Sequence, residues 1–64
     1  MRRLCLTSLD EYLDKPIWVK TYMSNYLRGT LLGVFVNGDI EVLFDGDDQI
    51  TTLSSLTHEV VVWA

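Results

Sequence analysis

The sequence predicts a mostly β fold, with a short N-terminal helix followed by a five-stranded, strongly bent antiparallel sheet that forms a small open barrel. Its 64 residues suffice for a single domain, residues 1–64. An apolar stretch over residues 26–44 is interrupted by Asn37-Gly38, which is typical of a β-hairpin with a type I′ turn. Gly29 and Gly33 share one face of the first arm, where missing side chains permit a bend or a close backbone approach.

Length and composition limit what this domain can do. A core drawn from so short a chain gives only marginal stability by itself. Cys5 is the only cysteine, so it has no partner for an intrachain disulfide, and we interpret it as a small buried hydrophobic residue. A net charge of −4 excludes the class of strongly basic proteins that bind along the phosphate backbone of a nucleic acid. No apolar run approaches the length of a membrane span, so we expect a cytoplasmic protein without membrane contact.

Helix-start chemistry precedes the predicted strands. Ser8 and Glu11 have the spacing of a capping box, and Pro16 restricts the residue before it to extended geometry. We therefore expect a two-turn helix over residues 8–14, with one apolar face packed on the sheet. The leucines at helical spacing are Leu6, Leu9 and Leu13.

Five strands are predicted after this helix. Residues 17–22 alternate, with Ile17 and Val19 on one face and Trp18, Lys20 and Tyr22 on the other. Residues 23–25 should turn the chain into strands over residues 26–36 and 39–44. The acidic segment 45–48 is interpreted as a solvated turn, because the further ligands and the closing Glu of a calcium loop are missing. Residues 49–55 form a weaker strand, and residues 56–59 a tight connection.

The last apolar run, residues 60–63, does not alternate, which indicates burial on both faces. As the final strand it is also a candidate sheet edge, and no Lys, Pro or bulge signal within it discourages pairing with another chain. We therefore expect another subunit to cover it, which makes the protein a homo-oligomer. The predicted interface residues are Val60, Val61, Val62, Trp63, Ile50 and Leu53.

The element order and two segments resemble the Sm/Lsm family of RNA-associated ring proteins. The likeness lies in residues 17–22, Ile-Trp-Val-Lys-Thr-Tyr, and more specifically in residues 27–33, Leu-Arg-Gly-Thr-Leu-Leu-Gly. The second segment is similar to the core of the first Sm motif, and alignment on Gly29 runs from residue 17 to residue 44 without a gap. The predicted helix matches the one that precedes the first strand in this family. The resemblance implies a closed ring, of five to eight subunits in the family pattern.

The resemblance also implies a nucleotide pocket at the tip between the second and third predicted strands. The family has Asp-x-x-Met-Asn there, whereas residues 35–39 are Phe-Val-Asn-Gly-Asp, so neither the Asp nor the Asn is retained. The Arg of the second motif is also missing, since residues 55–59 are Ser-Leu-Thr-His-Glu. Phe35 or His58 is then the candidate stacking surface in a modified pocket. The candidate nucleic-acid-binding residues are Phe35, Asn37, Asp39, His58, Arg28 and Lys20.

Two functions remain as hypotheses. The first is a ring that binds single-stranded RNA weakly, in a ribonucleoprotein or RNA-chaperone role. The alternative is a ring that acts as a scaffold for a protein partner without binding RNA, with Trp18 and Tyr22 as an aromatic patch. Phe35 is alternatively a core residue and His58 a turn residue. The sequence holds no Ser-His-Asp set, metal-ligand cluster or Gly-rich phosphate loop, so we expect no enzyme, metal or cofactor.

Overall fold

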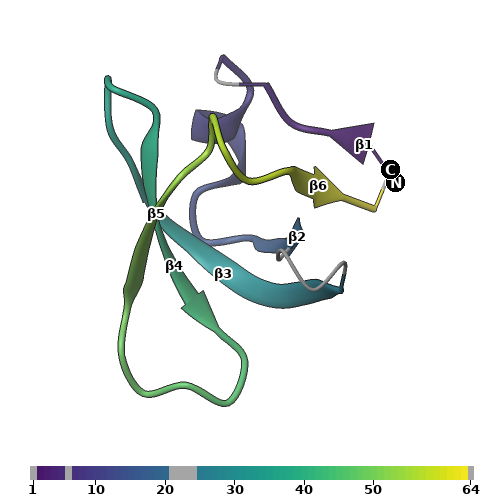
Figure 1. Ribbon diagram of the computed structural model, residues 1–64, viewed down its shortest axis with the longest axis vertical. Coiled ribbons are helices and arrows are strands. Elements are labelled where there is room, and N and C mark those ends of the chain that lie inside the picture. The colour runs from purple at the N-terminus through teal and green to yellow at the C-terminus, as the bar shows by residue number, and fades with distance from the viewer. Residues whose placement is uncertain (1, 6, 21–24, 64) are drawn as a thin grey trace.

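The computed structural model describes residues 2–5, 7–20 and 25–63, which form one antiparallel sheet and a 3-10 helix (Figure 1). The strands are β1 (Arg2–Arg3), β2 (Pro16–Lys20), β3 (Tyr26–Val34), β4 (Asp39–Phe44), β5 (Thr51–Ser54) and β6 (Val60–Val62), and the helix is η1 (Leu9–Tyr12). Their order across the sheet is β1-β6-β2-β3-β4-β5. A small, mostly β domain is therefore confirmed, with six strands among the described residues where five were predicted. The sheet is not closed, because β1 and β5 are its two edges.

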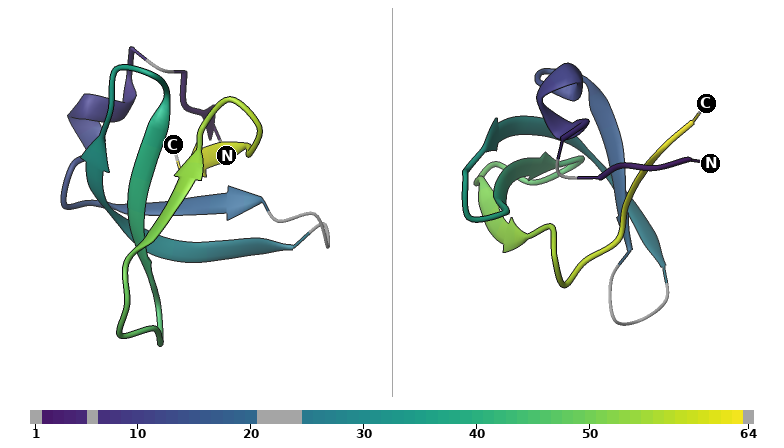
Figure 2. Two further views of the ribbon diagram at one scale, coloured as in Figure 1. Left: turned by 60° about the vertical axis from the view of Figure 1, so that its left-hand side comes forward. Right: turned by 90° about the horizontal axis from the view of Figure 1, so that it is seen from above.

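The long strand β3 carries the bend of the sheet. Its first half pairs with β2 and most of its length pairs with β4, and the β2–β3 pair crosses the β4–β5 pair steeply (Figure 2). A register shift between Leu31 and Gly33 marks a bulge, which increases local twist. A Cβ atom at Gly29 would lie 2.7 Å from Val42 Cγ1 and 2.9 Å from the carbonyl oxygen of Leu43. The predicted close approach at Gly29 is confirmed.

The predicted hairpin between β3 and β4 is confirmed, but its turn is not type I′. That turn requires positive φ at both central residues. Gly38 has a φ of 95°, whereas Asp14 is the only non-glycine residue with positive φ in the described part of the chain, so Asn37 does not qualify. The amide of Gly38 donates to the Phe35 carbonyl at 3.0 Å, and the amide of Phe35 donates to the Asp39 carbonyl at 2.9 Å. This is a three-residue loop whose last residue is a left-handed glycine.

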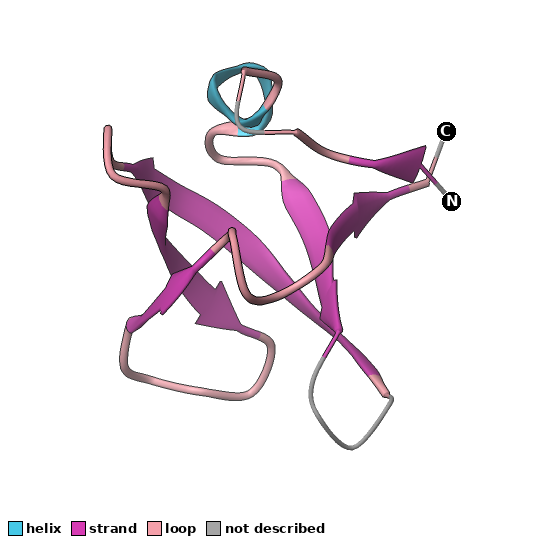
Figure 3. Cartoon of the chain, turned by 45° about the horizontal axis from the view of Figure 1, so that its top comes forward, coloured by secondary structure: helices cyan, strands magenta, loops and turns pink. Residues whose placement is uncertain are grey.

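The α-helix predicted over residues 8–14 is wrong, since only the 3-10 turn η1 forms there (Figure 3). Asp14 leaves helical geometry with a φ of 64°, and its amide donates to the Leu31 carbonyl of β3 at 2.7 Å. A two-turn helix has too few internal hydrogen bonds to outweigh such a contact with the sheet. The Ser8 side chain makes no capping hydrogen bond, and Leu9 is fully buried. Leu6 of the predicted apolar stripe lies outside the described residues.

The prediction that the final strand is a bare sheet edge is also wrong. β6 lies between β1 and β2, with Arg3 opposite Val61 on one side and Trp18 opposite Val61 on the other. A strand of two charged residues is a common way to protect a hydrophobic edge. Two residues are too few for a period to be visible, which is why the sequence pattern did not reveal β1. The predicted burial of the strand on both faces is confirmed for its three valines.

Side-chain alternation in β2 is as predicted for its described residues. Ile17 and Val19 are buried, Trp18 is half-buried and Lys20 is exposed. Residues 21–24, which include Tyr22 of the predicted aromatic patch and part of the predicted turn, lie outside the described residues. The core lies on the opposite face from Trp18 and consists of Leu4, Leu9, Ile17, Val19, Leu31, Ile40, Val42, Val60 and Val62.

Cys5 is exposed, so its interpretation as a buried residue is wrong. Its Sγ lies 3.2 Å from Ser8 Oγ and 3.1 Å from Thr7 Oγ1. These hydroxyls can donate to a thiolate, with Ser8 the larger influence, and they lower the pKa of Cys5 to about 7.

In the described part of the chain, no helix is long and apolar enough to cross a lipid bilayer.

Candidate functional site

The structure divides the predicted RNA-binding residues between the two ends of β3. Phe35, Asn37 and Asp39 lie at the β3–β4 turn, where the end of β3 meets the start of β4. Arg28 and Lys20 belong to the opposite end, where the start of β3 pairs with β2. Phe35 and Arg28 line two different surface pockets, and these pockets have no lining residue in common.

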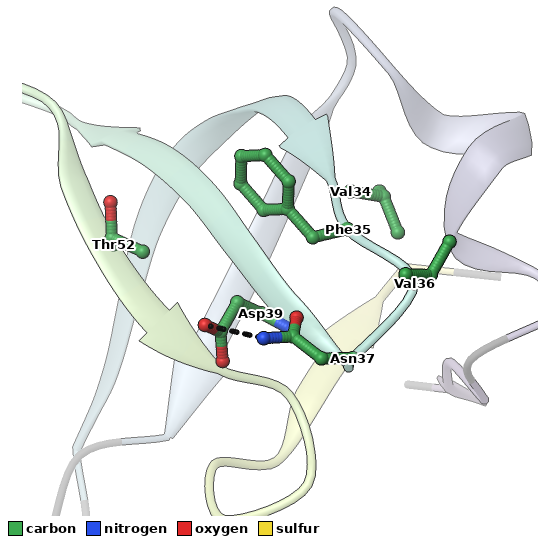
Figure 4. Close-up of a pocket in the computed structure, with 6 residues that line it drawn as sticks. All are labelled: Val34, Phe35, Val36, Asn37, Asp39 and Thr52. Carbon is green, nitrogen blue, oxygen red and sulfur yellow. Dashed lines mark hydrogen bonds between the residues drawn. The ribbon is translucent and has the colours of Figure 1, made fainter.

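The first group lines a surface pocket of about 610 Å³ at the hairpin turn, which we call the tip pocket. The Phe35 ring and the side chains of Asn37 and Asp39 project to the same side of the hairpin (Figure 4). Phe35 is 46% exposed, so the alternative that it is a core residue is wrong. The residues lining the tip pocket are Val34, Phe35, Val36, Asn37, Asp39 and Thr52.

Two hydrogen bonds hold the polar side of the tip pocket. The Asn37 amide Nδ2 donates to Asp39 Oδ2 at 3.2 Å, and the backbone amide of Asp39 donates to Asn37 Oδ1 at 3.1 Å. The Asn37 side chain thereby mimics a backbone turn, which is common for Asn at a hairpin. Asp39 Oδ1 takes part in neither of these two bonds. A carboxylate oxygen beside an exposed aromatic ring presents an acceptor next to a stacking surface.

The electrostatics of the tip pocket favour a base over a phosphate. Among the described residues that line it, Asp39 is charged and none is basic. Glu41 is opposite Thr52 in the β4–β5 ladder and adds a second carboxylate close by. A planar ring with N–H donors suits such a pocket, whereas a phosphate would be repelled. Within the described residues, no group of three or more His, Cys, Asp or Glu side chains is arranged to hold a metal ion.

His58 lies in the turn that joins β5 to β6, as one alternative predicted. Its backbone amide donates to the Ser54 carbonyl at 3.1 Å, and its Nδ1 is 3.1 Å from the same oxygen. This turn packs on the hairpin, because Ser55 Oγ donates to the Gly38 carbonyl at 2.6 Å and the Ser55 amide donates to it at 2.8 Å. His58 itself bonds within its own turn and is not among the residues that line the tip pocket.

The second group belongs to a surface on the opposite face of the sheet from the core. Trp18 and Trp63 meet edge to face, with ring centroids 5.8 Å apart and an interplanar angle of 83°. The Arg28 guanidinium lies 5.8 Å from the centroid of the Trp18 ring, within the range of a cation–π interaction. The Lys20 ammonium lies 5.9 Å from the centroid of the Tyr26 ring. We call these five residues the aromatic–basic face.

Two acidic residues contact the aromatic–basic face. Arg28 Nη1 is 2.8 Å from Asp45 Oδ2, and both side chains are about half exposed, so this ion pair adds little stability. The Tyr26 hydroxyl donates to Glu59 Oε2 at 2.6 Å, and this hydrogen bond to a carboxylate raises the pKa of Tyr26. The sequence pattern did not assign Tyr26 to a binding surface, and it assigned Trp63 to the predicted subunit interface. Tyr26 lies opposite Lys20 in the β2–β3 ladder, so the pairing of these two predicted strands could have placed it on the same face as Lys20.

The predicted interface residues have different surroundings. Val60, Val61 and Val62 are buried within their own subunit. Leu53 packs against the core, and Ile50 is 54% exposed beside the sheet edge β5.

Comparison of the chain with protein-family models, with curated proteins and with solved structures gives no match.

Proposed function

We propose that the chain is an Sm-like module that binds single-stranded RNA, and that the tip pocket receives one base. The observation that carries this proposal is the exposed Phe35 ring beside the hydrogen-bonded Asn37–Asp39 pair. Stacking on an aromatic ring is tolerant of base identity, while polar groups at the ring edge add selectivity. Support also comes from the resemblance of residues 27–33 to the first Sm motif.

The carboxylate of Asp39 sets the base preference in this proposal. As an acceptor it favours bases that present N–H donors and disfavours edges that carry acceptors alone. Guanine offers two neighbouring donors on its Watson–Crick edge, and a carboxylate can accept both. We therefore expect the tip pocket to prefer guanine over the other bases.

Assembly into a closed ring of five to eight subunits is the second part of the proposal. The two edges of the described sheet, β1 and β5, are different surfaces, as a head-to-tail contact requires. Pairing β5 of one subunit with β1 of the next would continue the sheet around a ring and cover Ile50. A ring repeats each tip pocket around one axis, and such repetition raises avidity by about 10² or more.

Fluorescence anisotropy with short labelled RNAs tests the binding. Binding of U-only, A-only, guanine-containing and mixed-sequence strands is compared at low and at physiological salt. The oligomeric mass of the protein is measured in the same sample by light scattering. We expect Phe35→Ala to weaken binding about tenfold, since stacking contributes about 1–3 kcal/mol per base. Leu13→Ala, which removes an exposed apolar side chain that does not line the tip pocket, is the matched control and should bind RNA normally.

Asp39→Asn separates base recognition from stacking. Replacing the carboxylate with an amide changes an acceptor into a mixed donor and acceptor, so the preference for guanine should fall while overall affinity changes little. Absence of binding to every RNA at low salt, by an intact assembly, would overturn the RNA proposal. A protein partner would then be the remaining function of this scaffold.

A further inference from the structure

The aromatic–basic face has no role in the function proposed so far. Trp63 is 65% exposed although it contacts the Trp18 ring edge to face. Val61 lies opposite Trp18 in the ladder and is buried, yet it is not part of the core. Trp18 and Trp63 thus shield Val61 on the outer side of the sheet and leave ring surface open to solvent.

The cations of this face are placed beside its rings. Arg28 lies over Trp18 and Lys20 lies over Tyr26, and these residues come from the paired strands β2 and β3. Arg3 is opposite Val61 and therefore shares this side of the sheet. Three of the five basic residues of an acidic chain gather here. The surface offers planar rings for stacking and cations for phosphates on one side of one sheet.

We infer that the aromatic–basic face is a second contact site for single-stranded RNA, which holds the backbone of a strand whose base enters the tip pocket. This inference rests on the proposed function, because it adds a site for the same ligand. The residues that line the tip pocket include the carboxylate of Asp39 and no basic side chain, so the phosphates of a bound strand need cations from elsewhere in the assembly. Charge complementarity favours a polyanion with planar rings over an acidic peptide, which would leave the tryptophans without stacking partners.

The ion pair between Arg28 and Asp45 does not block this role. Both side chains are about half exposed, and such pairs contribute little to stability, so a phosphate can replace the carboxylate at low cost. The hydrogen bond to Asp45 engages one guanidinium nitrogen, Nη1, and an arginine has five N–H donors. Arg28 can therefore contact a phosphate while its guanidinium stays over the Trp18 ring.

Both tryptophans of the chain belong to this face, so intrinsic tryptophan fluorescence reports its occupancy. The first measurement titrates unlabelled oligo-U into the wild-type protein, and we expect saturable quenching that weakens as salt rises. Lys20→Ala should weaken binding severalfold. Lys15→Ala is the matched control, because it removes the same charge from a lysine that also lies 5.9 Å from a tyrosine ring, that of Tyr12, outside this face.

The second measurement is anisotropy with labelled RNA for Trp63→Ala and Phe35→Ala, with melting temperatures recorded for each. Weaker binding by Trp63→Ala of about tenfold, at a melting temperature near that of the wild type, supports the face. If Trp63→Ala fails to fold, the RNA affinities of Lys20→Ala and Lys15→Ala decide whether the aromatic–basic face binds RNA. RNA binding that depends on Phe35 but produces no quenching, with Lys20→Ala equal to Lys15→Ala, overturns the face and leaves the proposed function standing. Binding that depends on Lys20 but not on Phe35 keeps the face and removes the tip pocket, and no binding at all overturns both.

Discussion

The first and last parts of β3 have similar glycines in different surroundings. At Gly29 an added Cβ would meet the side chain of Val42 and the backbone of Leu43, neither of which can move without disturbing the sheet. At Gly33 it would meet Glu41 Oε1 at 2.8 Å, which is the far end of a flexible side chain. The difference teaches that the sheet is rigid where two strand pairs cross and adaptable near the tip pocket.

The two candidate binding surfaces show the same difference between the start and the end of β3. Near the start of β3, the aromatic–basic face is braced by ring contacts and by the shielded Val61. Near its end, the tip pocket is built from a turn in which Val36 is fully exposed and Phe35 is nearly half exposed. A rigid surface suits repeated backbone contacts, whereas a turn can adjust to a base. Three predictions break or sharpen this contrast, and a fourth tests a residue outside both ends.

Gly29→Val should produce the largest effect. The valine side chain must displace Val42 and the strand backbone, so we expect a loss of about 3 kcal/mol or more and aggregated protein. Gly33→Ala, the matched control on the same strand, should lose less than about 1 kcal/mol because Glu41 can rotate away. Chemical denaturation followed by circular dichroism measures both. Equal stability losses for the two variants would remove the distinction between the two ends.

Val61→Glu should be nearly as severe. Its side chain is buried within the subunit, so an unpaired carboxylate there should cost about 3 kcal/mol and unfold the monomer rather than only dissociate a ring. Ile50→Glu places the same charge on an exposed residue near β5 and should leave the melting temperature within a few degrees of wild type. If β5 is the assembly edge, Ile50→Glu should lower the mass measured by light scattering. A stable Val61→Glu monomer would contradict the shielding of Val61.

Gly38→Ala tests the adaptable end with a moderate effect. Its φ of 95° is strained for alanine, and the new Cβ would lie 3.0 Å from Leu56 Cγ. We expect a loss of about 1–2 kcal/mol, part of which Leu56→Ala should restore if crowding contributes. Thermal melts of the single and double variants measure this coupling. No loss of stability in Gly38→Ala would show that the left-handed glycine is not needed by the turn.

Cys5 belongs to neither end of β3 and gives the smallest expected effect. The Ser8 and Thr7 hydroxyls lower its pKa to about 7 from 9.0. The folded state therefore favours the thiolate, a contribution to stability that is present above pH 9 and lost as the pH falls through 7. Alkylation by iodoacetamide should rise with a midpoint near pH 7, and Ser8→Ala should move that midpoint upward. A midpoint near 9 in the wild type would contradict these hydrogen bonds.

Gly33→Ala serves as the reference for this last measurement. It changes the tip without touching the segment around Cys5, so its alkylation profile should match that of the wild type. A shifted profile in Gly33→Ala would mean that the tip and the N-terminal segment are coupled, which would weaken the comparison between two independent ends.

Local patterns in the sequence predicted the parts of the fold that depend on neighbouring residues. Alternation placed Ile17 and Val19 inside and Trp18 and Lys20 outside, because successive side chains of a strand point to opposite faces. Asn37-Gly38 located the hairpin that gathers the tip pocket, since glycine permits the positive φ of its last turn residue. Phe35, Asn37 and Asp39 could thus be grouped from the sequence.

Only the tertiary structure decided how distant segments meet. Arg2–Arg3 pairs with β6, which lies far from it in the sequence. A strand of two residues is too short to show the alternation from which a strand is predicted. The same is true of Asp14, whose bond to Leu31 ends the helix that local capping signals favour. Trp63 meets Trp18 for a similar reason, because β6 inserts beside β2. Local composition determines which residues form strands and turns, whereas the free energy of burying the core selects which strands become neighbours.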